Sequence, residues 1–219
     1  MRRALQRAVS GFCATVLLAL PLPSLAAPIR PDQTILPLET SPVIDGILSK
    51  GEWGAAAFTF PNDDFTVIPG DAPEQPTLGG SAYLRYDEEH FYLALETVYD
   101  AHENTERDYD LWRGDALQIQ ISYPRRSDRR SFGFALSSED GVSRAYQSGD
   151  HRHTYVCRET GDAFFIRRDE ETKTTVYEIA LPLAWFSAET ALAPGEQVAF
   201  SFAIHMHNGC YYEWAGGIV

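Results

Sequence analysis

The chain has 219 residues, a formal net charge of −13 and a hydrophobic fraction of 44%. This length is enough for one domain with a substantial core. The acidic charge argues against binding to nucleic acid or to an anionic membrane, because both need basic patches.

Residues 1–26 have the pattern of a secretory signal peptide. Three arginines occur by residue 7, an apolar run spans residues 12–22, and Ser24 and Ala26 are the small residues of a cleavage site. The apolar run is too short to span a bilayer. We therefore predict export to the periplasm or the extracellular space, no membrane insertion and one mature domain over residues 27–219. Losing three arginines and no acids takes the net charge from −13 to −16.

Most of the mature chain consists of short segments with strand patterning. Residues 117–123 alternate Leu, Gln, Ile, Gln, Ile, Ser and Tyr, which is typical of a strand with one buried face. Residues 61–80 are rich in Pro, Gly and Asp and are predicted to form a loop. Many short strands separated by turns predict an all-β fold, an antiparallel β-sandwich. The other predicted strands are 34–38 (an edge strand), 55–60, 81–86, 90–98, 131–137, 142–147, 163–168, 174–181, 198–207 and 210–214. Asn208-Gly209, between the last two, predicts a hairpin turn.

One or two short helical turns are predicted beside these strands. Ser49 and Glu52 have the spacing of a capping box, so a short helix with an inward-facing Trp53 is expected there. Residues 182–186 begin with Pro and are expected to form a single helical turn.

A long polar loop leads to Trp112, just before the strand at 117–123. Gly114 permits a sharp entry into that strand, so Trp112 is expected at the end of the sheet. Long loops that bring an aromatic side chain to the rim of a sheet often build ligand sites. Two interpretations are open: Trp112 is a ligand platform, or it is a lid over the sandwich core.

Two predicted strands present small side chains away from the core. Small residues let a ligand, or a covering loop, approach a sheet closely, and both interpretations are open. His205 and His207 share this outward face, so an H-x-H metal site is an alternative, and His151 and His153 form a second such pair. The outward residues are Ser131, Gly133, Ala135 and Ser137 on one strand, and Ser201, Ala203, His205 and His207 on the other.

Cys157 and Cys210 are the cysteines of the mature chain, since Cys13 lies in the predicted signal peptide. An isolated pair in an oxidising compartment is more often a disulfide than a metal site. We predict that the two are joined; the alternative is two separate buried thiols.

The sequence contains no recognisable catalytic motif. The G-x-S-x-G and H-E-x-x-H patterns are absent. Paired carboxylates for glycoside hydrolysis need not be close in sequence, so a glycoside-processing enzyme component is kept as an alternative. The acidic residues of the loop at 99–110 are expected to form a solvated face, with a loop calcium site as the other interpretation.

Four stretches, taken in order, resemble carbohydrate-binding module family 9 and its DOMON-like relatives. The resemblance covers residue 41 to the C-terminus and implies a β-sandwich. The stretches are 42–53, with Ile-Asp-Gly followed by an acid and Trp; 84–95, similar to the first hairpin of the family; 112–119, with Trp-x-x-Asp-x-hydrophobic; and 177–185, similar to its Glu-x-x-Ile-Pro-Trp segment.

The resemblance implies a non-catalytic domain that holds a saccharide between two Trp side chains. Trp112 matches the first by motif, and Trp214 stands near the chain end, where the second is expected. Sugar rings expose apolar C–H faces that suit the flat indole. Asp115 and Gln118 belong to the same motif and are expected ligand-binding residues; Gln118 replaces a Glu of the family, and an Arg of its next strand has no counterpart near Phe132.

The resemblance also implies structural calcium, without indicating its ligands, and leaves the oligomeric state open. Some related sandwiches bind haem, so a haem- or metal-binding electron-transfer subunit is the principal alternative function. Met206 is an unfavourable haem ligand, because it alternates onto the core face, opposite His205 and His207.

Overall fold

The computed structural model describes residues 33–70, 77–122, 130–148, 155–159, 163–185, 195 and 197–215. The predicted signal peptide, Cys13, His151 and His153 lie outside these residues. In the described part of the chain, no helix is both long and apolar enough to cross a membrane.

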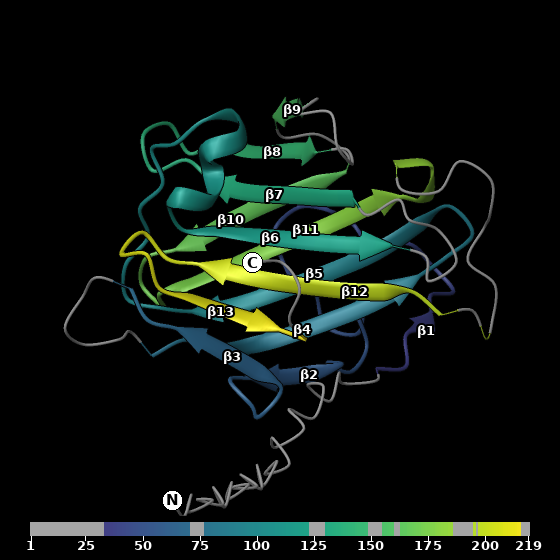
Figure 1. The fold of residues 1–219 in the computed structure, drawn as a ribbon. Coiled ribbons are helices and arrows are strands. Elements are labelled where there is room, and N and C mark those ends of the chain that lie inside the picture. The colour runs from purple at the N-terminus through teal and green to yellow at the C-terminus, as the bar shows by residue number, and fades with distance from the viewer. Residues whose placement is uncertain are drawn as a thin grey trace, which may run out of the picture.

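Two sheets packed face to face build the molecule, as Figure 1 shows. The six-stranded sheet has the order β1-β4-β5-β11-β10, with β2 also paired to β4. Its strands are β1 (Leu36–Pro37), β2 (Phe58–Phe60), β4 (Gly79–Tyr86), β5 (His90–Val98), β10 (Phe164–Asp169) and β11 (Thr174–Pro182). The seven-stranded sheet has the order β3-β13-β12-β6-β7-β8-β9. Its strands are β3 (Phe65–Ile68), β6 (Ala116–Ser122), β7 (Arg130–Leu136), β8 (Ser143–Ser148), β9 (Tyr155–Glu159), β12 (Ala199–His205) and β13 (Tyr211–Trp214).

The pairing is antiparallel except between β1 and β4, so the predicted all-β, antiparallel sandwich is confirmed. The hairpin predicted at Asn208–Gly209 joins β12 to β13, and Gly209 has the positive φ of 80° that such a turn requires. The helical turn predicted at 182–186 is present as η2 (Leu183–Trp185).

The core lies between the sheets and consists of the residues that alternate inward. Leu117, Ile119 and Ile121 of β6 are all at most 1% exposed. The residues of β5 and β7 that alternate in the same way are buried in the same cluster: Phe91, Leu93, Leu95, Phe132, Phe134 and Leu136. Period-two patterning therefore identified which side of each of these strands faces the other sheet.

Three local expectations were wrong. Strand β3 lies within the predicted loop 61–80, and β9 was not predicted; both are edge strands in the sheet order, with one neighbour each. Residues 49–53 form a turn rather than a helix. The Glu52 carboxylate still accepts a hydrogen bond from the Ser49 N–H at 3.3 Å, but it also accepts one from the Val43 N–H at 2.7 Å. The capping-box contacts thus close a turn without continuing into a helix.

The predicted disulfide between Cys157 and Cys210 is also wrong. Cys210 directly precedes β13 and is a free, buried thiol, whereas Cys157 belongs to β9. Four strands, β12, β6, β7 and β8, lie between β13 and β9. At about 4.8 Å per strand step, five steps separate the two by about 24 Å, and a disulfide needs Cα atoms less than about 7 Å apart. The order of the strands in the sheet therefore keeps the cysteines apart.

Candidate functional site

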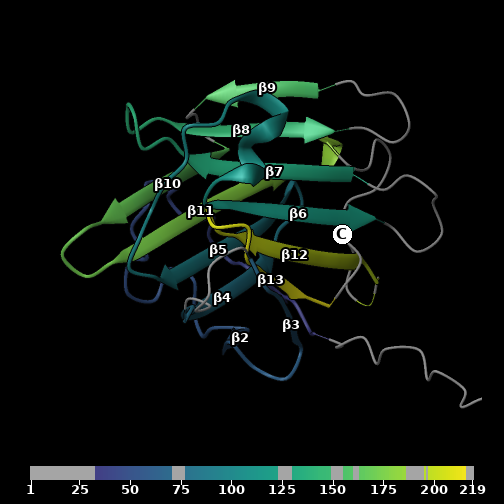
Figure 2. The same ribbon diagram turned by 60° about the vertical axis from the view of Figure 1, so that its left-hand side comes forward.

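A short 3-10 helix lies on the outer face of the seven-stranded sheet. This element, η1 (Asp108–Arg113), ends the long loop at 99–107 and lies over β6, β7 and β8, as the turned view in Figure 2 shows. Leu111 points towards the sheet, is 1% exposed and packs with Ala116, Ala135 and Tyr146. Trp112 is 38% exposed. The structure thus places Trp112 outside the inter-sheet core, on a platform fixed by Leu111.

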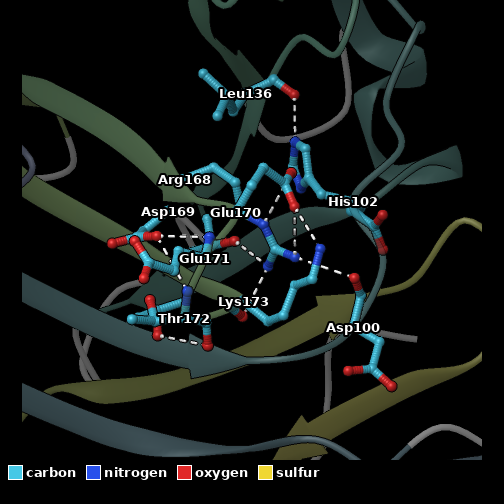
Figure 3. Close-up of polar contacts among 12 residues, drawn as sticks. Asp100, His102, Leu136, Arg168, Asp169, Glu170, Glu171, Thr172 and Lys173 are labelled. Carbon is cyan, nitrogen blue, oxygen red and sulfur yellow. Dashed lines mark hydrogen bonds and ion pairs between the residues drawn. The ribbon is translucent and has the colours of Figure 1, made fainter.

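Polar contacts hold the beginning of the loop that leads to η1. Arg168, at the end of β10, donates to the backbone carbonyl of Asp100 at 3.2 Å and is also held by Glu170 and the Lys173 carbonyl, as Figure 3 shows. The His102 ring lies 2.9 Å from the Leu136 carbonyl, at the end of β7. The loop is therefore attached to both sheets before it reaches η1.

Asn104 and Gly114 fix the other end of η1. The buried Asn104 amide nitrogen donates to the carbonyls of Leu111, at 2.8 Å, and Asp115, at 3.0 Å. A Cβ at Gly114 would lie 2.7 Å from the Asn104 side chain, so only glycine fits against this contact. Gly114 and the Asp115 carbonyl thus fix the connection between η1 and β6, through their contacts with Asn104.

Asp115 lies beneath the platform and contacts other protein groups. It is 5% exposed, and its carboxylate accepts hydrogen bonds from the backbone N–H groups of Glu103 and His207. The Nδ1 atom of His207 lies 3.1 Å from Asp115 Oδ2. Asp115, predicted to bind ligand, is thus placed where it joins the η1 loop to the β12–β13 turn.

Gln118 belongs to a polar row that crosses three strands beside Trp112. Gln118 Oε1 lies 3.0 Å from His205 Nε2, and the Gln118 amide nitrogen donates to Ser131 Oγ at 3.3 Å. Because Oε1 only accepts, His205 donates from Nε2 and keeps a lone pair on Nδ1. Burial lowers the pKa of His205 from its usual 6.5 to about 4, so the ring is neutral at pH 7. Gln118 and Ser131 are partly exposed whereas His205 is 7% exposed, so the amide and the hydroxyl are the groups of this row that can reach a ligand.

The His205 ring joins Trp112 to a second aromatic residue, Tyr211. The ring centroids of Trp112 and His205 are 6.2 Å apart, and those of His205 and Tyr211 are 5.4 Å apart. Tyr211 pairs directly with His205 across the β12–β13 hairpin, so both side chains share the outer face. Sequence reasoning missed Tyr211, although the Asn-Gly turn combined with the outward position of His205 was sufficient to place it.

Trp214 does not face this site, which corrects the expected pair of Trp platforms. It is 4% exposed and stacks on Phe58, with ring centroids 5.0 Å apart, and on Phe202 at 5.9 Å. It pairs with Phe202, which faces the core, and lies an odd number of residues from the outward-facing Tyr211. Alternation along β13 therefore turns the Trp214 indole inward.

The small outward residues of β7 are covered by the protein itself. The ring of Tyr146 occupies the space above Gly133, where a Cβ would clash with it, and Ala135 is 1% exposed beneath η1. Of the two interpretations of this face, coverage by a neighbouring segment is correct for β7.

The two histidines of the H-x-H motif contact different partners. His205 contacts Gln118, and His207 contacts Asp115. Within the residues that the structure describes, no three His, Cys, Asp or Glu side chains are grouped so that they could hold a metal ion.

Solved structures with the same architecture have been described for sugar-binding proteins. A carbohydrate-binding module of family 9 from Caldicellulosiruptor kristjanssonii in complex with cellotriose aligns with a TM-score of 0.50 and 14% identity, over 82% of this chain and 83% of that one. This chain has the fold of a family 9 carbohydrate-binding module. A family 9 module from the same organism in complex with glucose aligns with a TM-score of 0.49 and 16% identity, over 82% and 84% of the two chains. No protein-family model and no curated protein matches the sequence.

Proposed function

We propose that this protein is an exported, non-catalytic carbohydrate-binding domain with Trp112 as its sugar platform. The observation that carries the proposal is the half-exposed Trp112 beside the polar row of His205, Gln118 and Ser131. A sugar ring presents an apolar face to an indole and hydroxyl groups at its edge, and this site offers a partner for each. Export rests on the signal-peptide pattern of residues 1–26.

The fold favours this proposal over the enzymatic alternative. A solved neighbour with the same fold binds cellotriose, so β-linked glucose oligomers are the first ligands to test. The site has one exposed Trp, which replaces the predicted grip between two, because Trp214 is in the core. A platform of this kind holds a ring from one side and leaves the other side to solvent.

The test is a glycan array with the mature domain, followed by calorimetric titration of the sugars that bind. Trp112 is 38% exposed, so a sugar ring that covers the free part of its side chain buries about 60–95 Å² and gains about 1.5–2.4 kcal/mol. Trp112→Ala should therefore weaken binding by about 10- to 50-fold. Leu36→Ala is the control, because Leu36 is exposed but lies on β1 in the other sheet.

Two outcomes would contradict the proposal. One is the absence of binding to every saccharide on the array. The other is a Soret band in the absorbance spectrum of the purified protein, which would identify a haem protein on the same fold.

A further inference from the structure

Side chains of η1 fall into three ridges, because residues i and i+3 of a 3-10 helix lie on the same side. Leu111 belongs to the ridge that faces the sheet. Asp110 and Arg113 form the second ridge, and their i,i+3 ion pair at 3.1 Å shows that the geometry holds in this element. Tyr109 and Trp112 form the third ridge and are 40% and 38% exposed.

The two aromatic rings of η1 are held in place by contacts on the same outer sheet face. Tyr109 packs edge-on against Tyr146, with centroids 5.1 Å apart, and Trp112 packs edge-on against His205 at 6.2 Å. The guanidinium of Arg113 lies 5.4 Å from the centre of the Trp112 ring. A ridge whose rings are already ordered loses little conformational entropy when a ligand binds.

We propose that the aromatic ridge of η1 is a two-subsite platform for an oligosaccharide, with Trp112 under one sugar ring and Tyr109 under the next. This inference rests on the proposed function and narrows its ligand to chains of at least two sugar units. Three residues at about 2 Å per residue separate Tyr109 from Trp112 by about 6 Å along the helix axis, a spacing similar to one sugar unit of a chain.

Next to the aromatic ridge, the Asp110–Arg113 pair supplies the polar groups that a sugar chain needs. The Asp110 and Arg113 side chains are 50% and 58% exposed, so carboxylate acceptors and guanidinium donors can reach the hydroxyl groups at the edge of a stacked ring. The aromatic area is too small for a protein partner. Two such side chains bury at most about 500 Å², below the roughly 800 Å² per partner of a stable protein interface.

The test compares the wild-type domain with Tyr109→Ala on a glycan array that carries each sugar as a monomer, dimer and trimer. Wild type should bind the dimer and trimer about tenfold more tightly than the monomer, since one further stacked ring is added. Tyr109→Ala should remove that gain and leave monomer binding unchanged. Tyr109→Trp should retain it, and Leu36→Ala should behave as wild type.

Each result is decisive, and melting temperatures of all variants verify that they are folded. Equal affinity for monomer and trimer in the wild type, or an unchanged chain-length preference in Tyr109→Ala, would overturn the second subsite and leave the proposed function standing. The absence of any saccharide binding by the wild type would overturn both.

Discussion

Trp53 and Trp112 lie on the outer faces of opposite sheets, and the protein uses them in opposite ways. Trp53 packs on the six-stranded sheet with Tyr92, Ala94 and Ala180 and is 2% exposed, whereas Trp112 lies on the seven-stranded sheet and is 38% exposed. Both positions were identifiable as Trp residues outside regular strands. The difference between them depends on which sheet face the chain covers.

Glu178 explains how the face around Trp53 is covered. This fully buried carboxylate, on β11, accepts hydrogen bonds from the Asp45 and Gly46 N–H groups and from Trp53 Nε1, all between 2.7 and 2.9 Å. Burial raises the pKa of Glu178, and the three donors oppose that rise. A single side chain thus attaches residues 45–53 to the sheet, and the indole of Trp53 is enclosed beneath them.

Around Trp112 the covering element is much smaller. The 3-10 helix η1 is six residues long. It buries Leu111 and leaves Trp112 38% exposed. No acid comparable to Glu178 is within hydrogen-bonding distance of Trp112 in the part of the chain that the structure describes. Trp53 is therefore buried because a chain segment is hydrogen-bonded over it. Trp112 stays accessible because no segment covers it in the described part of the chain.

The largest expected effect is that of Trp53→Ala on stability. Removing this enclosed indole leaves a cavity and deprives Glu178 of a donor, so the free energy of unfolding should fall by about 3–5 kcal/mol. Urea unfolding of the mature domain measures it. A loss below about 1 kcal/mol would mean that the segment over the six-stranded sheet does not enclose Trp53 in solution.

His205 provides an intermediate effect, through pH. Its folded pKa of about 4 lies below the ordinary 6.5, so the unfolded chain binds a proton that the folded one does not as pH falls from 6.5 to 4. Stability from this group is fully present above pH 6.5 and is lost by pH 4, by about 2–3 kcal/mol. Urea unfolding at pH 7, 5.5 and 4 measures the slope.

The matched variant for this pH effect is His205→Gln, which keeps an N–H donor for Gln118 and does not titrate. The stability difference between wild type and His205→Gln should shrink steadily from pH 7 to pH 4. A constant difference would contradict a buried, neutral His205 beside Trp112.

The smallest expected effect is that of Trp112→Ala on stability. An exposed platform contributes little to the core, so the free energy of unfolding should change by less than about 1 kcal/mol, although sugar binding should fall sharply. A melting-temperature loss equal to that of Trp53→Ala would remove the distinction between the two faces and, with it, the interpretation of Trp112 as a platform.

Patterning succeeded wherever one face of a strand meets the other sheet. The alternation of β5, β6 and β7 and the Asn-Gly turn were sufficient for the sandwich, because burial of one face imposes a period of two on any sequence that forms such a strand. The same reasoning missed β3 and β9, which are paired on one side only and are short, four and five residues.

The structure brings together some of the residues that the sequence grouped and separates others. Trp112 and Gln118 do lie near each other, joined through His205, because the motif that contains them spans the junction between η1 and β6. Trp214 was misplaced since its assignment rested on its position near the chain end, and not on its register with β12. Tyr211 of β13 faces outward instead, because it pairs with the outward-facing His205 of β12.

By itself the sequence determined the β-sandwich, the inward faces of its main strands and the presence of a Trp at a sheet end, because these follow from periodicity and turn chemistry within a few residues. Only the tertiary structure decided which cysteines can meet, which Trp is enclosed and which aromatic side chains share a face. Those properties depend on the order and register of strands far apart in the chain, and a shift of one residue or one strand reverses each of them.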